Sequence, residues 1–258
     1  MKRMHAVILC AGYATRMGAL TRTTPKPLLP VGGKPIIDYL VDEMVRFAGF
    51  DSIRVVTNDR FYPAFAQWRQ ARTERSVASM PTLEIINDGT TSNDNRLGAL
   101  GDLQLALKGL PAGDRVVAAA GDNIFLFPLI GFWQRFAAST DHWILALRER
   151  DLRDLRRSAV LVLDVEERVL AVHQRPADPI SEWTNPMIYC LQPTAAARLR
   201  EMLSDGRYRH GHNFIDVLCR QERVRAFKCE GERLHVGDEL ALRAAHERLQ
   251  KPGLRERP

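Results

Sequence analysis

The chain has 258 residues, 45% of them hydrophobic and 26% charged, which is typical of one large or two small globular α/β domains. It has no run of roughly 18 apolar residues for a membrane span and no signal peptide, so we expect a cytoplasmic protein without a membrane partner. The formal charge of +6 comes without a compact Lys/Arg block, which favours phosphorylated small molecules over nucleic acid as the anionic partner.

The first half of the chain alternates strand-like and helix-like segments. We predict buried strands at 6–9, 53–57, 83–87 and 115–120, and helices at 36–45, 62–72 and 97–107, the first of them ended by Gly49. This order predicts an α/β fold with a Rossmann-like, doubly wound, mostly parallel sheet. Ligands of such sheets bind beyond the carboxyl ends of the strands.

The second half of the chain is less regular. Its patterns predict strands at 144–147, 159–163, 169–172 and 187–191, and helices at 194–203 and 239–250. No boundary separates the halves, so we expect one domain over 1–250. The nucleotide-binding half would be about 1–135, a smaller mixed β substrate-binding part about 136–250, and 251–258 a flexible tail. The four cysteines match no zinc or redox spacing and are expected to be free thiols.

The segment that leaves the first strand combines small residues with two cations. Ala11 and Gly12 lack bulk, so a base or a phosphate can approach the backbone closely. Arg16 supplies a planar fork of donors suited to phosphate oxygens, and Lys26 stands between two prolines that stiffen its loop. A solvated strand–loop–helix turn is the alternative. The ordered combination favours a phosphate site.

These segments resemble the opening of the sugar-1-phosphate nucleotidyltransferases. That family carries G-x-G-T-R-[LM], then P-K-P-L-[LV]-P-[VI], then G-K-P-[IL]. This chain has G-Y-A-T-R-M at 12–17, P-K-P-L-L-P-V at 25–31 and G-K-P-I at 33–36. Ala14 departs from the family's glycine. Because alanine tolerates a positive φ poorly, we expect a slightly reshaped loop there.

The resemblance implies a reaction in which the phosphate oxygen of a sugar 1-phosphate attacks the α-phosphate of an NTP. Magnesium assists, and pyrophosphate leaves. Carried over by position, Arg16 would hold the β- and γ-phosphates, and Lys26 would contact the phosphates at the reacting centre. Leu9, Ala11 and Gly12 would lie against the nucleotide.

Two further segments extend the implied nucleotide site. L-G-A-L-G-D-L at 97–103 resembles the family's L-G-T-A-G-A-L, in which a glycine backbone contacts the base, and Gly98 takes that place. Asn93 stands where some members use a glutamine to read the base edge. The polar run 87–95 around Asn93 is also compatible with a solvated loop.

Asp122 follows Gly121 at the end of a buried strand, as in the family's metal-binding G-D pair. A carboxylate in that position is costly unless it is paired or binds a metal. Mg²⁺ prefers one or two carboxylates plus phosphate oxygens, as an NTP site provides. Capping of the following segment is the alternative. The upstream motifs favour Asp122 as the Mg²⁺ ligand.

The substrate half departs from the family at several positions. Gln174 and Arg175 fall on the glutamate and lysine of x-x-E-K-P, which contact the sugar hydroxyls and the sugar phosphate. Asn185 matches the asparagine of N-[AT]-G-[IL]-Y, whereas Met187 replaces its glycine. We expect Gln174, Arg175 and Asn185 to bind the substrate and Met187 to reshape the pocket.

The last departure concerns the second metal ligand. R-L-H-V-G-D at 233–238 resembles W-x-D-[IV]-G-T, whose aspartate binds metal, and His235 takes its place. An imidazole is poorly matched to Mg²⁺. Three alternatives stay open: His235 or Asp238 completes the metal site, Asp122 alone suffices, or the metal is not Mg²⁺.

We therefore expect an Mg²⁺-dependent nucleotidyltransferase of EC 2.7.7 type that acts on an NTP and a phosphorylated small molecule, with a homo-oligomer left open. Two alternatives remain. One is a phosphocholine or phospho-alcohol cytidylyltransferase, to which the altered Gln174, Met187 and His235 point. The other is a non-catalytic nucleotide-sugar-binding regulatory protein, which the missing second aspartate motivates.

Overall fold

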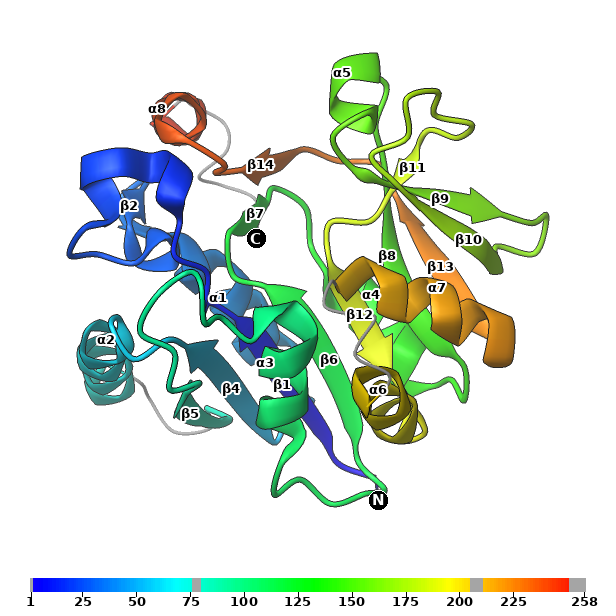
Figure 1. The fold of residues 1–258 in the computed structure, drawn as a ribbon, viewed down its shortest axis with the longest axis horizontal. Coiled ribbons are helices and arrows are strands. Elements are labelled where there is room, and N and C mark those ends of the chain that lie inside the picture. The colour runs from blue at the N-terminus through cyan, green and yellow to red at the C-terminus, as the bar shows by residue number, and fades with distance from the viewer. Residues whose placement is uncertain (1, 76–79, 205–210, 251–258) are drawn as a thin grey trace.

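The computed structural model describes residues 2–75, 80–204 and 211–250. Its centre is a sheet of ten strands (Figure 1). Nine follow the order β10-β9-β11-β8-β12-β6-β1-β4-β5, and β13 pairs with β8. The strands are β1 (Met4–Leu9), β4 (Ser52–Thr57), β5 (Thr82–Asn87), β6 (Arg115–Ala120), β8 (His142–Arg148), β9 (Ala159–Leu163), β10 (Val169–Gln174), β11 (Trp183–Thr184), β12 (Ile188–Leu191) and β13 (Val224–Cys229).

The two halves of the sheet differ in strand direction. Strands β6, β1, β4 and β5 are parallel neighbours, as the β–α alternation predicts. Strand β12 joins β6 in the antiparallel direction, and antiparallel pairs continue through β11, β9 and β10. The predicted fold, a doubly wound parallel sheet with a smaller mixed β part, is confirmed.

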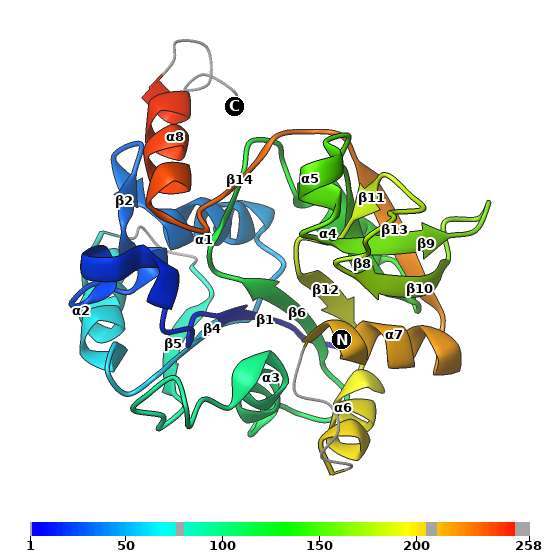
Figure 2. The same cartoon turned by 45° about the horizontal axis from the view of Figure 1, so that its top comes forward.

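Helices cover both faces of the sheet (Figures 1 and 2). They are α1 (Ile36–Phe47), α2 (Tyr62–Glu74), α3 (Gly98–Leu107), α4 (Ile130–Ala137), α5 (Leu152–Leu155), α6 (Ala195–Ser204), α7 (Gly211–Gln221) and α8 (Glu239–Gln250). Alternation along β1 sets the layers, because Ala6 and Ile8 face the core under α1, α2 and α4, whereas Val7 faces the core under α3, α6 and α7. No described helix is long and apolar enough to cross a membrane.

Short elements gather beyond the carboxyl end of β1. They are the 3₁₀ turns η1 (Thr15–Thr21) and η2 (Lys26–Leu28), the strand pair β2 (Pro30–Val31) and β3 (Lys34–Pro35), and the strand pair β7 (Asn123–Phe125) and β14 (Arg233–His235). Helix α8 packs on β2 and β14 (Figure 2). The carboxyl-terminal helix therefore lies against the segment that follows the first strand.

Helix α1 extends past the predicted range 36–45, but it ends before Gly49, the residue predicted to terminate it. Its last residue is Phe47, and Ala48 takes the left-handed conformation at the C-cap, with φ +54°. Gly49, the predicted terminator, instead makes room for the Phe47 ring, because a Cβ there would lie 2.4 Å from Cε1. Helices commonly end on a left-handed glycine, so Ala48 carries the strain that glycine would avoid.

We expect Ala48→Gly to raise the free energy of unfolding by about 0.5–1 kcal/mol, because the left-handed region costs alanine but not glycine. Urea denaturation measures it. Ala71→Gly, at an exposed position of helix α2, is the matched control and should lower stability by about 1 kcal/mol. Equal losses in both variants would contradict the assigned conformation of Ala48.

Candidate active site

The candidate site begins where two neighbouring parallel strands end. Leu9 of β1 lies opposite Ala120 of β6, so the loops after these strands leave the sheet side by side. The Gly121 amide donates to the Leu9 carbonyl over 3.2 Å. A Cβ on Gly121 would lie 2.3 Å from Cys10 Sγ. Only glycine therefore fits between the first loop and Asp122.

The stiff proline-framed turn delivers Lys26 to this place. Pro25 caps η2 with φ −64°, and the Leu29 amide closes the turn on the Lys26 carbonyl. Lys26 Nζ donates to Asp122 Oδ2 at 2.5 Å, although 96 residues separate the two in sequence. Their side chains are only 13% and 23% exposed. The predicted cation and the predicted metal ligand thus form one ion pair.

Cations around Asp122 keep its carboxylate ionised. Burial alone would raise the pKa of Asp122, but Lys26, His235 and Arg233 outweigh it and hold that pKa below its ordinary value. Asp122 is therefore fully charged near neutral pH. It can bind a cation without first losing a proton.

Arg233 and Asn123 are site residues that the sequence analysis missed. Strand β14 pairs with β7 so that His235 lies opposite Asn123. Arg233 Nη1 donates to Asn123 Oδ1 at 3.1 Å, and Asn123 Nδ2 donates to the Pro186 carbonyl at 3.2 Å. Burial lowers the pKa of Arg233, an effect that the nearby Asp122 opposes. The signal was available, because Arg233 stands at the tryptophan of the W-x-D-like motif.

The donors around Asp122 fit a magnesium ion that is held mainly by phosphate and water. His235 lies beside Asp122, close enough for its charge to lower that pKa. Asp238 caps α8 instead, accepting from the Ala241 amide at 2.9 Å. Within the described residues, no three His, Cys, Asp or Glu side chains cluster as metal ligands. A single carboxylate suits Mg²⁺ that keeps NTP oxygens and water as its other ligands.

The loop after β1 has the open backbone that the small residues predict. Ala11 is buried, and its carbonyl accepts from Asn58 Nδ2 at 3.0 Å. Gly12 is exposed with open space where a Cβ would stand. Ala14 adopts φ +48°, so the alanine occupies a conformation that favours glycine. Arg16 lies in η1, but its side chain is outside what the structure describes.

The other predicted nucleotide contacts lie on the neighbouring loop. Gly98 opens α3 with φ +76°. Asn93 is exposed in the loop between β5 and α3, and its carbonyl accepts from Arg96. Leu9 is half-buried at the end of β1.

The predicted substrate contacts lie in the mixed half of the sheet. Gln174 ends β10 at the far edge, and Arg175 follows it exposed with φ +46°. Asn185 is buried, and both ends of its amide bond the backbone, donating to Leu145 and accepting from Met187. Met187 adopts φ +60° and, through its carbonyl, accepts from the Ala120 amide. The structure thus places Met187 beside the end of β6.

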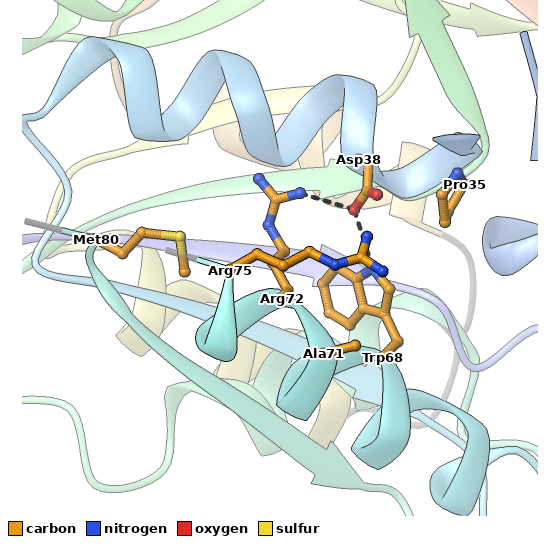
Figure 3. A pocket seen from close by; sticks show the side chains of 7 residues that line it. All are labelled: Pro35, Asp38, Trp68, Ala71, Arg72, Arg75 and Met80. Atoms are coloured by element: carbon orange, nitrogen blue, oxygen red, sulfur yellow. Dashed lines mark hydrogen bonds and ion pairs between the residues drawn. The ribbon is translucent and has the colours of Figure 1, made fainter. Parts of the chain in front are cut away.

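Two hollows lie away from these residues. One, of about 410 Å³, opens between α1 and α2, where Asp38 accepts from Trp68 and Arg72 (Figure 3). The other, of about 500 Å³, is lined by α3, α6 and residues such as Val116 and Leu191. Neither Lys26 nor Asp122 lines either hollow. In the first, the carboxylate and a guanidinium already neutralise each other.

The family model for the MobA-like NTP transferase domain matches residues 6–223. The chain belongs to this family of NTP transferases.

The four cysteines of the chain are free, as predicted.

Individual proteins give more distant likenesses. A glucose-1-phosphate adenylyltransferase of Thermosipho melanesiensis is 25% identical over 262 residues, covering 98% of this chain and 63% of that protein. A 2-aminoethylphosphonate cytidylyltransferase of Lancefieldella rimae is 46% identical over 55 residues, covering 21% of this chain and 22% of that protein. The chain spans about half to two thirds of the length of the curated relatives that match it over nearly its whole length.

Solved structures share the fold. A putative glucose-1-phosphate thymidylyltransferase from Bacillus anthracis superposes with a TM-score of 0.82 over 96% of both chains at 18% identity. At this identity the likeness establishes the architecture and no more. It agrees with the doubly wound, mostly parallel sheet that the sequence predicts, and with the nucleotide-diphospho-sugar transferase type of that sheet, which the family resemblance implies.

We expect Gly121→Ala to destabilise the protein by about 1–3 kcal/mol, because the new methyl group collides with Cys10 Sγ. In a Cys10→Ala background, where that sulfur is gone, the cost should fall. Urea unfolding of the four proteins gives the coupling energy. An identical cost in both backgrounds would show that Cys10 and Gly121 do not pack as described.

Proposed function

We propose that the chain transfers a nucleoside monophosphate from an NTP to the phosphate group of a sugar 1-phosphate or a similar phosphorylated small molecule. The observation that carries this proposal is the Lys26–Asp122 pair at 2.5 Å beyond the ends of β1 and β6. Membership of the NTP transferase family supports it, as does the similarity to a glucose-1-phosphate adenylyltransferase.

In this reaction an acceptor phosphate oxygen bonds to the α-phosphorus, and the bond from that phosphorus to the bridging oxygen of pyrophosphate breaks. The charge that must be stabilised lies on the phosphate oxygens. We assign that task to the ammonium of Lys26 at the α-phosphate and to the guanidinium of Arg16 at the β- and γ-phosphates. The stiff η2 turn holds Lys26 in place before the NTP arrives, which is the condition for efficient electrostatic stabilisation.

We assign Asp122 as the protein ligand of Mg²⁺, with His235 beside it and Asp238 as a weaker candidate. When bound, the metal would neutralise phosphate charge and orient the α-phosphate for in-line attack. Arg233 has a different task. Its guanidinium holds Asn123 and adds positive charge next to Asp122.

We place the remaining contacts by loop. Leu9, Ala11 and Gly12 would lie along the nucleotide, and Asn93 and Gly98 would meet the base. We assign the acceptor to a separate set of residues, Gln174, Arg175 and Asn185. Because the two halves of the chain would then serve one reaction, we propose residues 1–250 as one functional domain. Asn185 would act mainly by holding Met187, since its amide is bonded to the backbone at both ends.

A phospho-alcohol or phosphonate acceptor is the second candidate. Met187 adopts a left-handed backbone conformation that is strained for methionine and would be unstrained for glycine. It lies at the end of β6, near Asp122. The partial similarity to a 2-aminoethylphosphonate cytidylyltransferase points the same way. Turnover of phosphocholine or 2-aminoethylphosphonate with CTP, but not of hexose 1-phosphates with any NTP, would select this candidate.

We expect Lys26→Ala to lower turnover by about 10²–10³, because it removes a charge aimed at the reacting phosphate. Pyrophosphate release from a panel of NTPs and phosphorylated acceptors measures this. Lys228→Ala is the matched control, since Lys228 is ion-paired with Glu167 in the mixed half and should retain full turnover. A Lys26→Ala enzyme as fast as the wild type would refute the assigned role.

We expect EDTA to abolish turnover and Mg²⁺ to restore it. In Asp122→Asn the Mg²⁺ concentration for half-maximal turnover should rise at least tenfold, because the amide lacks the ligand's charge. In Asp238→Asn, at the α8 cap, the Mg²⁺ concentration for half-maximal turnover should stay within about twofold of the wild-type value if Asp122 is the main ligand. Full activity in EDTA would contradict metal assistance.

A further inference from the structure

Two carboxyl groups meet beneath the loop that joins β5 to α3. Asp102 of α3 is 6% exposed, and Asp88 follows β5 directly. The two groups lie within hydrogen-bonding reach of each other. Asp102 Oδ1 and Asp88 Oδ2 are both buried, and neither has a hydrogen-bond partner among the described residues. Neither the mechanism nor the nucleotide contacts proposed above use this pair.

Two adjacent buried carboxylates cannot both carry a charge cheaply. Burial first, and then the charge and hydrogen bond of Asp88, raise the pKa of Asp102 to about 7. With one proton between them, the O–H of one group can donate to the oxygen of the other. The pair is therefore a hydrogen-bonded bridge below neutral pH and a repelling pair above it.

Within the part of the chain that the structure describes, no cation acts on Asp102 in place of the missing proton. The elements packed on α3 present titratable groups that are neutral or already paired. After β1 these groups are Cys10 and Tyr13, whose pKa values burial raises. On β4, Arg54 donates to the Ala106 and Lys108 carbonyls. On α6 and α7, Arg198 pairs with Glu201 and Arg220 pairs with Asp216. Arg200 of α6 bonds its own helix. Only Asp88 is a source of charge on Asp102 among the described residues.

The bridge continues to the loop after β1. Asp88 Oδ1 accepts from both the amide and the hydroxyl of Thr90, each at 2.7 Å. The Thr90 hydroxyl lies 3.0 Å from the Tyr13 hydroxyl, and both side chains are buried. Tyr13 follows Gly12 directly. A continuous polar path thus runs from helix α3 through the β5 loop to the small-residue loop.

We propose that Asp102 is a positioning residue for the nucleotide, which in its protonated form locks the first turns of α3 to the loop after β1 through Asp88, Thr90 and Tyr13. This rests on the proposed function, since it assigns the nucleotide to those two loops. Loss of the shared proton sets the two carboxylates against each other. The loops then separate, and the nucleotide binds more weakly.

Asp102 is a position at which this chain departs from the family motif L-G-T-A-G-A-L. It stands at the last alanine of L-G-T-A-G-A-L, in the turn that follows Gly98. A buried acid in place of a methyl group adds a titrating group where the resemblance alone requires none.

The test compares nucleotide binding by wild type, Asp102→Asn and Asp88→Asn between pH 6 and 8.5. ATP, CTP, GTP, UTP and dTTP are titrated by calorimetry with Mg²⁺, and the tightest binder is carried through. An asparagine amide donates permanently, so either variant keeps the bridge without a titrating proton. Asp94→Asn, an exposed carboxylate of the same loop, is the matched control.

We expect the wild-type Kd to rise by about tenfold over this range with a midpoint near pH 7, and Asp94→Asn to follow it. The ratio of variant to wild-type Kd removes the titration of the nucleotide itself. It should fall with pH for Asp102→Asn and Asp88→Asn. A flat wild-type profile, or the same midpoint in both asparagine variants, would overturn the proposal.

The thermal midpoint, recorded for every protein, separates folding from positioning. If both asparagine variants unfold, a flat wild-type profile still refutes the proposal and a midpoint near pH 7 supports it. If no nucleotide binds the wild type at any pH, the proposed function itself has failed. A pH-independent Kd with clear binding sinks only the role of Asp102.

Discussion

The ion pair between Lys26 and Asp122 is the interaction on which the rest of the site depends. It exists because parallel strands β1 and β6 are neighbours and end together. Gly121 lets the Asp122 loop turn against Cys10, and the prolines of η2 aim Lys26 at it. Each element is local and simple. Their convergence is a property of the sheet order, which places distant segments at one edge.

The charge around this pair decides what the site can bind. One carboxylate faces Lys26, Arg233 and the nearby His235, so the site carries an excess of positive charge. That field suits a polyphosphate better than a bare divalent cation. A metal that enters with its nucleotide fits this balance, because the phosphates supply the missing negative ligands. The exchange of an aspartate for His235 is then consistent with a working site.

Much of the architecture could be predicted from sequence, and the failures have physical causes. The strand at Arg115–Ala120 and the helix at Glu239–Gln250 match in both bounds, because an apolar run and a helical stripe are strong signals. Strand β13 was missed although Val224 and Ala226 are buried in alternation, and α4 although its aromatic residues line one face. The short strands β7 and β14 form by pairing with each other, so no local sequence pattern predicts them. Motif order placed Lys26 and Asp122 at one predicted phosphate site, whereas their direct ion pair and the Asp88–Asp102 pair needed the tertiary structure.

The most direct test is a kinetic double-mutant cycle across the ion pair. Turnover is measured for wild type, Lys26→Ala, Asp122→Asn and the double variant at saturating Mg²⁺ and NTP. Because residues of one catalytic unit lose their effect together, the double variant should be no slower than about the worse single variant. Losses that simply multiply would show two independent sites and contradict a shared reacting centre.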